Sequence, residues 1–142
     1  MSTIAVSQHS EFIFETAPFA SCHASTMVEL RNGELLAAWF AGKSEGSRDV
    51  AIWASRRSAS HWSTPVVLMR ETKTPPWNPA LFHANDGGLW LYYKFGVRPR
   101  TWKAARSWSH DEGKTWSEPE RLPNSIYRPI RASHLCCKMG KF

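Results

Sequence analysis

The residues best suited to acid–base or anion-binding chemistry gather in one polar loop. Residues 41–48 read AGKSEGSR, and Asp49 follows directly. Glu45 and Asp49 supply carboxyl groups that can donate or accept a proton. Lys43 and Arg48 supply positive charges that can bind an anion. Loop carboxylates are more often simply solvated, so this loop alone does not establish a catalytic site.

Metal chemistry is not expected. The six histidines are scattered along the chain, and their spacing does not match a metal-binding motif such as HExxH. The three cysteines (Cys22, Cys136 and Cys137) form neither a CxxC motif nor a disulfide framework. The sequence therefore predicts no bound metal and no cofactor.

A second polar stretch, SHDEGKTWSEP, begins at Ser109 and has the residue order of a hairpin turn that leads into a strand. Asp111 can accept hydrogen bonds from nearby backbone N–H groups and from the Ser109 hydroxyl. Gly113 can take a positive φ that a side chain would resist. Thr115 and Trp116 then resume an extended conformation, and the indole is large enough to pack between two layers of sheet. We expect these five residues to have a structural role.

The chain contains an internal repeat with an offset of 54 residues and no gap. Nine identical pairs fall in the 36 positions from residue 33 to residue 68, against roughly two expected by chance from ordinary composition. The first members of these pairs are Gly33, Leu35, Gly42, Ala51, Ser55, Trp62, Ser63, Pro65 and Leu68. A repeat of this length built from short strands is typical of β-propeller blades.

The two copies are expected to form two four-stranded antiparallel blades, at residues 22–69 and 75–123, joined by a linker at 70–74. The strands of the first blade are expected at residues 22–30, 34–40, 49–55 and 62–69. Those of the second are expected at 77–82, 89–95, 102–108 and 116–122. No amphipathic helix of useful length is visible, so the expected class is all-β.

Two terminal segments flank the blades. Residues 1–21 form a lead-in in which 4–6 and 11–15 alternate well enough to be short strands. Residues 124–142 open like a third copy near residue 126 and then diverge into a tail with no turn, no second strand and no Trp.

The pattern Ser-x-Asp-x-Gly-x-Thr-Trp at 109–116 is the Asp box, so the chain resembles the sialidase (neuraminidase) superfamily. It is most similar to a branch of sialidase-like Asp-box repeat proteins. That resemblance is carried by the segments FASCHASTMVELRNGELLAAWFAGKSEGSRDVAIWASRR, PPWNPALF, LWLYYKFG and TWSEPERLP. It covers about residues 19–131 and implies a partial β-propeller, with about two blades of a six-bladed ring. In that branch, residues matching 128–134 usually read Gly-Pro-Ile-Lys-Asn-Lys-Pro, whereas here they read RPIRASH. The departure indicates a truncated or frame-shifted product, or a fragment.

The resemblance also implies a sugar-binding site on the propeller axis, at the face where the inner strands begin and opposite the Asp box. The residues expected there are His23, Ser25, Lys43, Glu45, Arg48, Asp49, Trp77, Asn78 and Lys94, with Arg98 and Arg100 close by. Sialidases use an aspartate from the first long loop as acid/base, for which Glu45 and Asp49 are the candidates. They also bind the substrate carboxylate with three arginines, the first of which aligns with His23. The other two, and a Tyr–Glu nucleophile pair, come from later blades.

Each of these residues also has a purely structural explanation. His23 can be a hydrogen-bonded histidine at a strand end. Trp77 and Asn78 can cap a strand, and the other tryptophans suit core packing. Lys94 and its neighbouring arginines are ordinary surface cations unless a pocket is completed around them.

The composition limits the classes of partner that are expected for this chain. The 18 Lys and Arg against 12 Asp and Glu give a net charge of +6, but the cations are spread along the chain and form no basic stripe. We therefore expect no nucleic-acid partner. No apolar run approaches the ~18 residues of a membrane span, and the N-terminus does not read as a signal peptide. A soluble, cytoplasmic protein without a membrane partner is expected.

The sequence leaves two functions open. One is a fragment of a sialidase-like glycoside hydrolase that cleaves a terminal sugar in the complete fold and is inactive alone. The other is a non-catalytic carbohydrate-binding or scaffold propeller. In both cases the expected partner is a sialoside or related glycan. Self-association through uncovered blade faces is also expected, because uncovered apolar faces drive association.

Overall fold

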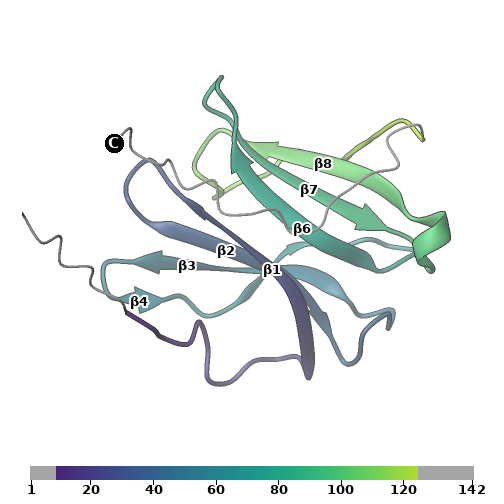
Figure 1. Cartoon of the computed structure of the whole chain (residues 1–142), viewed down its shortest axis with the longest axis horizontal. Helices are drawn as coiled ribbons and strands as arrows, with labels where there is room; N and C mark the ends of the chain where they lie inside the picture. The colour runs from purple at the N-terminus through teal and green to yellow at the C-terminus, as the bar shows by residue number, and fades with distance from the viewer. Residues whose placement is uncertain (1–8, 125–142) are drawn as a thin grey trace, which may run out of the picture.

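The structure is a computed structural model that describes residues 9–124. The strand expected at residues 4–6, the start of a third copy and the divergent tail lie outside the described residues. Two antiparallel sheets lie side by side (Figure 1). The architecture confirms the predicted all-β class.

Sheet A is formed by the first copy of the repeat. It contains β1 (Ser21–Glu29), β2 (Leu35–Gly42), β3 (Ala51–Ser58), β4 (His61–Trp62) and β5 (Val66–Met69). The strand order is β1-β2-β3-β4, and β5 also pairs with β3. The strand expected at residues 62–69 is therefore split into β4 and β5. Pro65 lies in the break, where its missing N–H suits an interruption of the ladder.

Sheet B is formed by the second copy. It contains β6 (Pro76–His83), β7 (Leu89–Phe95), β8 (Lys103–Ser109) and β9 (Glu120–Arg121), in that order, all antiparallel. A short 3-10 helix, η1 (Pro99–Thr101), lies between β7 and β8. The fourth strand, expected at residues 116–122, is much shorter than its sequence predicts.

The main core lies between the sheets. Leu36, Ile52 and Ala54 of sheet A pack against apolar residues of sheet B that include Leu91 and Tyr93. Trp116 is half-buried against the same cluster, and its Nε1 donates a hydrogen bond to the Gly113 carbonyl at 3.2 Å. The strand alternation explains this core, because residues two apart on β2, β3 and β7 point to the same face.

The other face of sheet A is covered by the lead-in segment. Phe14 lies 5.3 Å from Trp39, and Phe19 lies 5.0 Å from Trp53, measured between ring centroids. Residues 11–15 form no strand, which corrects the expectation from their alternating pattern. Ile13 and Phe14 of this stretch pack onto sheet A, and the purple segment in Figure 1 runs beneath that sheet.

Glu11 fastens the lead-in to the turn between β3 and β4. Its carboxylate forms an ion pair with Arg57 and accepts a hydrogen bond from Trp62 Nε1 at 3.2 Å. Arg57 occupies the position that Asp111 has in the second copy. The lead-in therefore supplies a carboxylate beside the turn that has lost its own.

Candidate functional site

The inner strands of both sheets carry a distortion at the same position of the repeat. The pairing of β1 with β2 shifts register between His23 and Thr26, and that of β6 with β7 shifts between Trp77 and Ala80. Ala24 (φ 56°) and Asn78 (φ 45°), 54 residues apart, have left-handed backbone conformations inside these bulges. Non-glycine residues in this region are strained, and bulges of this kind redirect side chains next to functional sites.

These bulges lie at the same end of the sheets as the polar loop. Ser21 pairs with Gly42, so β1 begins where β2 enters residues 43–49. Pro76 pairs with Phe95, so β6 begins beside the corresponding loop of sheet B. The Asp box lies at the opposite end. There Glu112 accepts a hydrogen bond from the Arg31 backbone N–H at 2.9 Å, in the turn between β1 and β2.

An aromatic cluster of Phe40, Trp77 and Trp102, called here the aromatic floor, lies between the bulges of the two inner strands. Trp77 lies 5.3 Å from Phe40 and stacks on Trp102 at 5.1 Å, and its Nε1 donates to the Gly96 carbonyl at 2.7 Å. His23 lies 5.6 Å from the Phe40 ring. Lys94 lies over Trp102, 5.2 Å from the ring centroid. Burial lowers the pKa of the Lys94 ammonium from its usual value.

Trp77 connects the floor to the polar loop. Gly46 has φ 80°, and a Cβ added there would lie 3.4 Å from Trp77 Cη2, so the loop backbone passes closely over the indole. Trp77 is only 6% exposed, which makes it a support for the site and not a surface on which a sugar ring can stack.

Asp49 is engaged within the loop itself. One carboxylate oxygen accepts a hydrogen bond from the Lys43 backbone N–H at 2.9 Å, and the other accepts one from the Ser47 hydroxyl. These bonds, with Ser47 the stronger cause, lower the pKa of Asp49 below its usual value. A carboxylate held ionised in this way is poorly suited to donate a proton.

The remaining predicted residues differ in their environments. Ser21 Oγ and His23 Nε2 lie 2.9 Å apart, so His23 is hydrogen-bonded at the start of β1. Ser25, Glu45 and Arg48 are exposed, and Asn78 is half-buried. The structure therefore brings His23 and Trp77 together around Phe40, with the loop of Glu45 beside them.

Two residues of the floor were missed by sequence reasoning. Phe40 looked like an ordinary strand residue, and Trp102 looked like the start of a strand. The repeat gave no signal for either, since their partners at the 54-residue offset are Lys94 and Arg48. The usable signal was an aromatic residue at a strand end next to a polar loop.

A tyrosine–glutamate contact occurs elsewhere, but it is buried. The Tyr93 hydroxyl donates a hydrogen bond to Glu71 Oε1 at 2.7 Å, and Tyr93 has no exposed surface. Burial, together with the Glu71 carboxylate, raises the pKa of Tyr93 far above its usual value. A tyrosine in this position cannot reach a substrate and therefore supports the core.

Within residues 9–124, no group of three His, Cys, Asp or Glu side chains is arranged to hold a metal ion. Over the same residues, no helix has the length and apolar character needed to cross a membrane.

A family model for the BNR repeat-like domain matches residues 33–142, which is most of the chain. The chain belongs to this family. This match, together with the fold likeness to a sialidase, confirms the resemblance to the sialidase-like branch of Asp-box repeat proteins. A search of curated proteins gives no match.

Solved structures that are similar to this BNR repeat-like chain include the following two. A protein of unknown function from Dyadobacter fermentans is 15% identical, with a TM-score of 0.60 over 72% of this chain and 36% of its own. The Hadza microbial sialidase Hz136 is 17% identical, with a TM-score of 0.59 over 75% of this chain and 26% of its own. At these identities the likeness concerns the fold. The chain spans about a third or less of the length of either structure.

Proposed function

We propose that this chain is part of a sialidase-like glycoside hydrolase and forms a segment of its sugar-binding face. The observation that carries the proposal is the pair of matched bulges at Ala24 and Asn78, which lie at one end of both inner strands. Membership of the BNR repeat-like family and the fold likeness to a sialidase support a carbohydrate ligand.

The residues around the bulges have the chemistry that a sugar requires. The His23 imidazole and the Asn78 amide can exchange hydrogen bonds with ring hydroxyl groups. Lys94 can provide a positive charge for a carboxylate-bearing sugar such as a sialoside. The aromatic floor of Phe40 and Trp77 holds these polar groups on rigid strands, which favours specific recognition.

For catalysis, Glu45 is the better candidate for the acid that protonates the glycosidic oxygen. Glu45 is exposed, whereas both carboxylate oxygens of Asp49 accept hydrogen bonds from other residues of the loop. An acid alone is not sufficient, because glycosidases need a second group to stabilise or attack the anomeric carbon. We therefore expect these 142 residues alone to bind a glycan without cleaving it.

The second candidate function is a non-catalytic carbohydrate-binding propeller. Two observations favour it: Asp49 is engaged in hydrogen bonds within its loop, and a histidine stands where the resemblance implies an arginine. A fluorogenic sialoside separates the two candidates in a longer protein that contains this segment. Turnover that is lost in Glu45→Gln supports the hydrolase, and binding without turnover supports the binding protein.

The proposed sugar site is tested by titrating the full chain with a panel of neutral and acidic trisaccharides and measuring heat or ligand NMR signals. His23→Ala and Asn78→Gly are expected to weaken binding about tenfold each, since each removes a hydrogen-bonding group. Glycine at position 78 tolerates the positive φ, so the bulge is retained. Ala24→Gly is the matched control and should leave binding unchanged. Binding that is unaffected by both variants, or absent for every sugar, would refute the proposal.

A further inference from the structure

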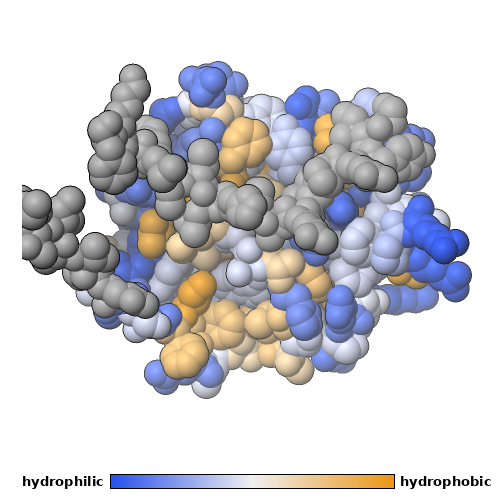
Figure 2. Space-filling view, in the orientation of Figure 1, coloured by the Kyte–Doolittle hydropathy of each residue, from blue (hydrophilic) through white to orange (hydrophobic). Residues whose placement is uncertain are grey.

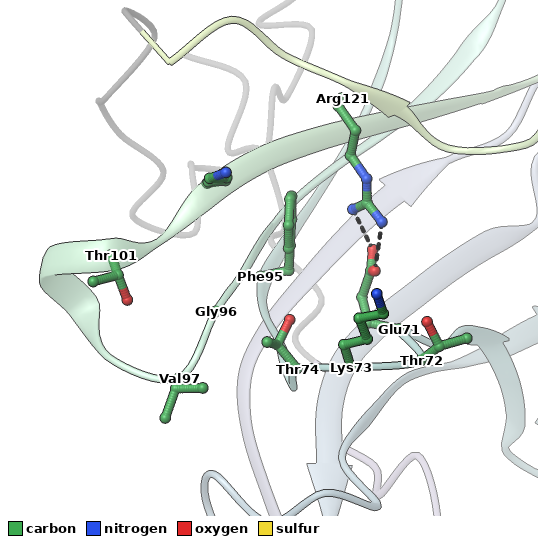
Figure 3. Close-up of a pocket in the computed structure, with 10 residues that line it drawn as sticks. Glu71, Thr72, Lys73, Thr74, Phe95, Gly96, Val97, Thr101 and Arg121 are labelled. Atoms are coloured by element: carbon green, nitrogen blue, oxygen red, sulfur yellow. Dashed lines mark hydrogen bonds and ion pairs between the residues drawn. The ribbon is translucent and has the colours of Figure 1, made fainter.

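A hollow with a volume of about 470 Å³ opens beside the linker between the sheets and the loop between β7 and β8. Lys73 and Thr74 lie on the linker side, Val97 and Thr101 on the loop side, and Arg121 on β9 (Figure 3). Lys103, at the start of β8, also lines the hollow. The volume of the hollow is in the range of small-molecule pockets.

The acidic group in the hollow is already neutralised. Glu71 Oε1 and Oε2 each accept a hydrogen bond from an Arg121 guanidinium nitrogen at 2.7 Å, as the dashed lines in Figure 3 mark. The Glu71 side chain is only 7% exposed, whereas that of Arg121 is 51% exposed. Arg121 also rests on the Phe95 ring, 4.0 Å from its centroid. The pair therefore presents the guanidinium to solvent and hides the carboxylate.

The segments around the hollow carry an excess of free positive charge. Residues 70–76 and 96–103 hold five cations and one acid, Glu71; the cations are Arg70, Lys73, Arg98, Arg100 and Lys103. Within the described residues none of the five forms an ion pair with a carboxylate. Among the arginines that do, Arg121 pairs with Glu71 in the hollow itself, whereas the others, which include Arg56 and Arg106, lie elsewhere.

The loop that carries Arg98 and Arg100 has a defined conformation. The Thr101 backbone N–H and its hydroxyl both donate to the Arg98 carbonyl, at 2.9 and 3.0 Å, and Pro99 opens the η1 helix between them. The hydrophilic surface at the right of Figure 2 lies over this helix. A fixed loop lowers the entropy cost of holding its cations near a ligand.

The geometry points to an acidic saccharide, a sugar bearing carboxylate or sulfate groups, as the ligand of this hollow. Lys73, Lys103 and Arg121 bind the anionic groups, and the Thr74 hydroxyl forms a hydrogen bond with a sugar hydroxyl. A nucleic acid is the poorer fit because base stacking needs an open aromatic face. The Phe95 ring in the lining lies under Arg121, and the Trp102 indole, next to Lys103 in the sequence, is packed between Trp77 and Lys94. The assignment of the anionic groups to a glycan rests on the proposed function.

The test compares trigalacturonate, a sulfated trisaccharide and a neutral trisaccharide of the same length, each titrated calorimetrically into the full chain. The acidic ligands are expected to bind about tenfold more tightly at low salt, and Lys73→Glu/Lys103→Glu should abolish this preference while leaving neutral-sugar affinity unchanged. Lys114→Glu, which lies outside the hollow, is the matched control for each single reversal, Lys73→Glu or Lys103→Glu, because all three change the net charge by the same amount. Which acidic ligand responds identifies the anion as carboxylate or sulfate.

Equal binding of acidic and neutral ligands, or an acidic preference that survives the double variant, overturns the inference and leaves the His23 and Asn78 site untouched. Tighter binding of a single-stranded oligonucleotide than of either acidic sugar also overturns it. Loss of neutral-sugar binding in His23→Ala, with the acidic preference kept, separates the two sites. Should the charge reversal disturb folding, Lys73→Gln/Lys103→Gln is expected to give the same result with smaller amplitude.

Discussion

Ala59 and Gly113 occupy equivalent positions 54 residues apart, and both have a left-handed backbone, with φ of 51° and 80°. The first copy has therefore kept the left-handed backbone at this one position after losing the glycine that suits it, although Ser58, unlike its counterpart Glu112 (φ 59°), is an ordinary strand residue. Arg57 contributes to this retention, because its Nη1 donates a hydrogen bond to the Ala59 carbonyl at 3.0 Å.

Ala59→Gly is expected to stabilise the protein by about 1 kcal/mol. The substitution relieves the steric cost of a Cβ in the left-handed region, which exceeds the added entropy of glycine in the unfolded chain. Chemical denaturation measures the effect. Ala104→Gly, in the ordinary strand β8, is the control and should destabilise by about 0.5–1 kcal/mol. A loss of stability in Ala59→Gly would contradict the strain at this turn.

Asp111→Asn is expected to lower the melting temperature at neutral pH and to flatten its dependence on acid. Hydrogen bonds from the Thr115 hydroxyl (2.6 Å) and backbone N–H (2.8 Å) lower the pKa of Asp111 well below its usual value. A lowered pKa contributes stability above the unfolded-state pKa, near 3.9, which is lost as the pH falls toward the folded-state pKa. Melting curves between pH 7 and pH 2 should therefore show the variant and wild type converging below about pH 4. Parallel curves would refute the role of Asp111.

Tyr93→Phe should cost about 1 kcal/mol of stability and Glu71→Ala about 2 kcal/mol. The first removes one buried hydrogen bond, and the second leaves the Tyr93 hydroxyl and Arg121 without their shared acceptor. Urea denaturation gives both values, with the exposed Glu118→Gln as a neutral control. An unchanged Glu71→Ala variant would show that the linker is not held by this network.

Phe14→Ala is expected to destabilise the protein by about 1–2 kcal/mol, because its half-buried ring packs on Trp39 and Phe19. Phe12, in the same segment, is 84% exposed, so Phe12→Ala is the matched control and should change nothing. Tryptophan fluorescence during unfolding reports both. Equal effects in the two variants would mean that the lead-in does not pack on sheet A in solution.

The outer face of sheet B should drive association of the chain at high concentration. Phe82 and Trp108 are each 40% exposed there, and Phe82 stacks on Tyr92. Phe82→Lys/Trp108→Lys should lower the weight-average mass measured by analytical ultracentrifugation. Phe12→Lys, which removes an exposed aromatic away from this face, should not. A monomeric wild type at high concentration would refute the expectation.

The fold class was predictable because the signals for it are local and repeated. Asn32 and Gly33 specify a hairpin, the short apolar runs at 35–41 and 89–93 indicate the strands β2 and β7, and the 54-residue offset transfers each assignment from one sheet to the other. The strand predicted at residues 11–15 was wrong, since Ile13 and Phe14 of this stretch pack on sheet A without joining a ladder of hydrogen bonds.

The site could be predicted only in part. The sequence placed His23 and the polar loop at one end of the strands, and the structure shows them there. The sequence could not show that the Asp49 carboxylate accepts hydrogen bonds from Ser47 and Lys43, because these contacts depend on how the loop folds. Nor could it show that Trp77 is buried, since burial of a strand-end indole depends on the sheet beside it.

The lead-in covers Trp39 on one face of sheet A, and this arrangement indicates an order in which the two sheets can fold. Sheet B covers the opposite face of sheet A, and its own outer face carries the exposed Phe82 and Trp108. As the chain leaves the ribosome, sheet B can bury the face of sheet A that the lead-in leaves open.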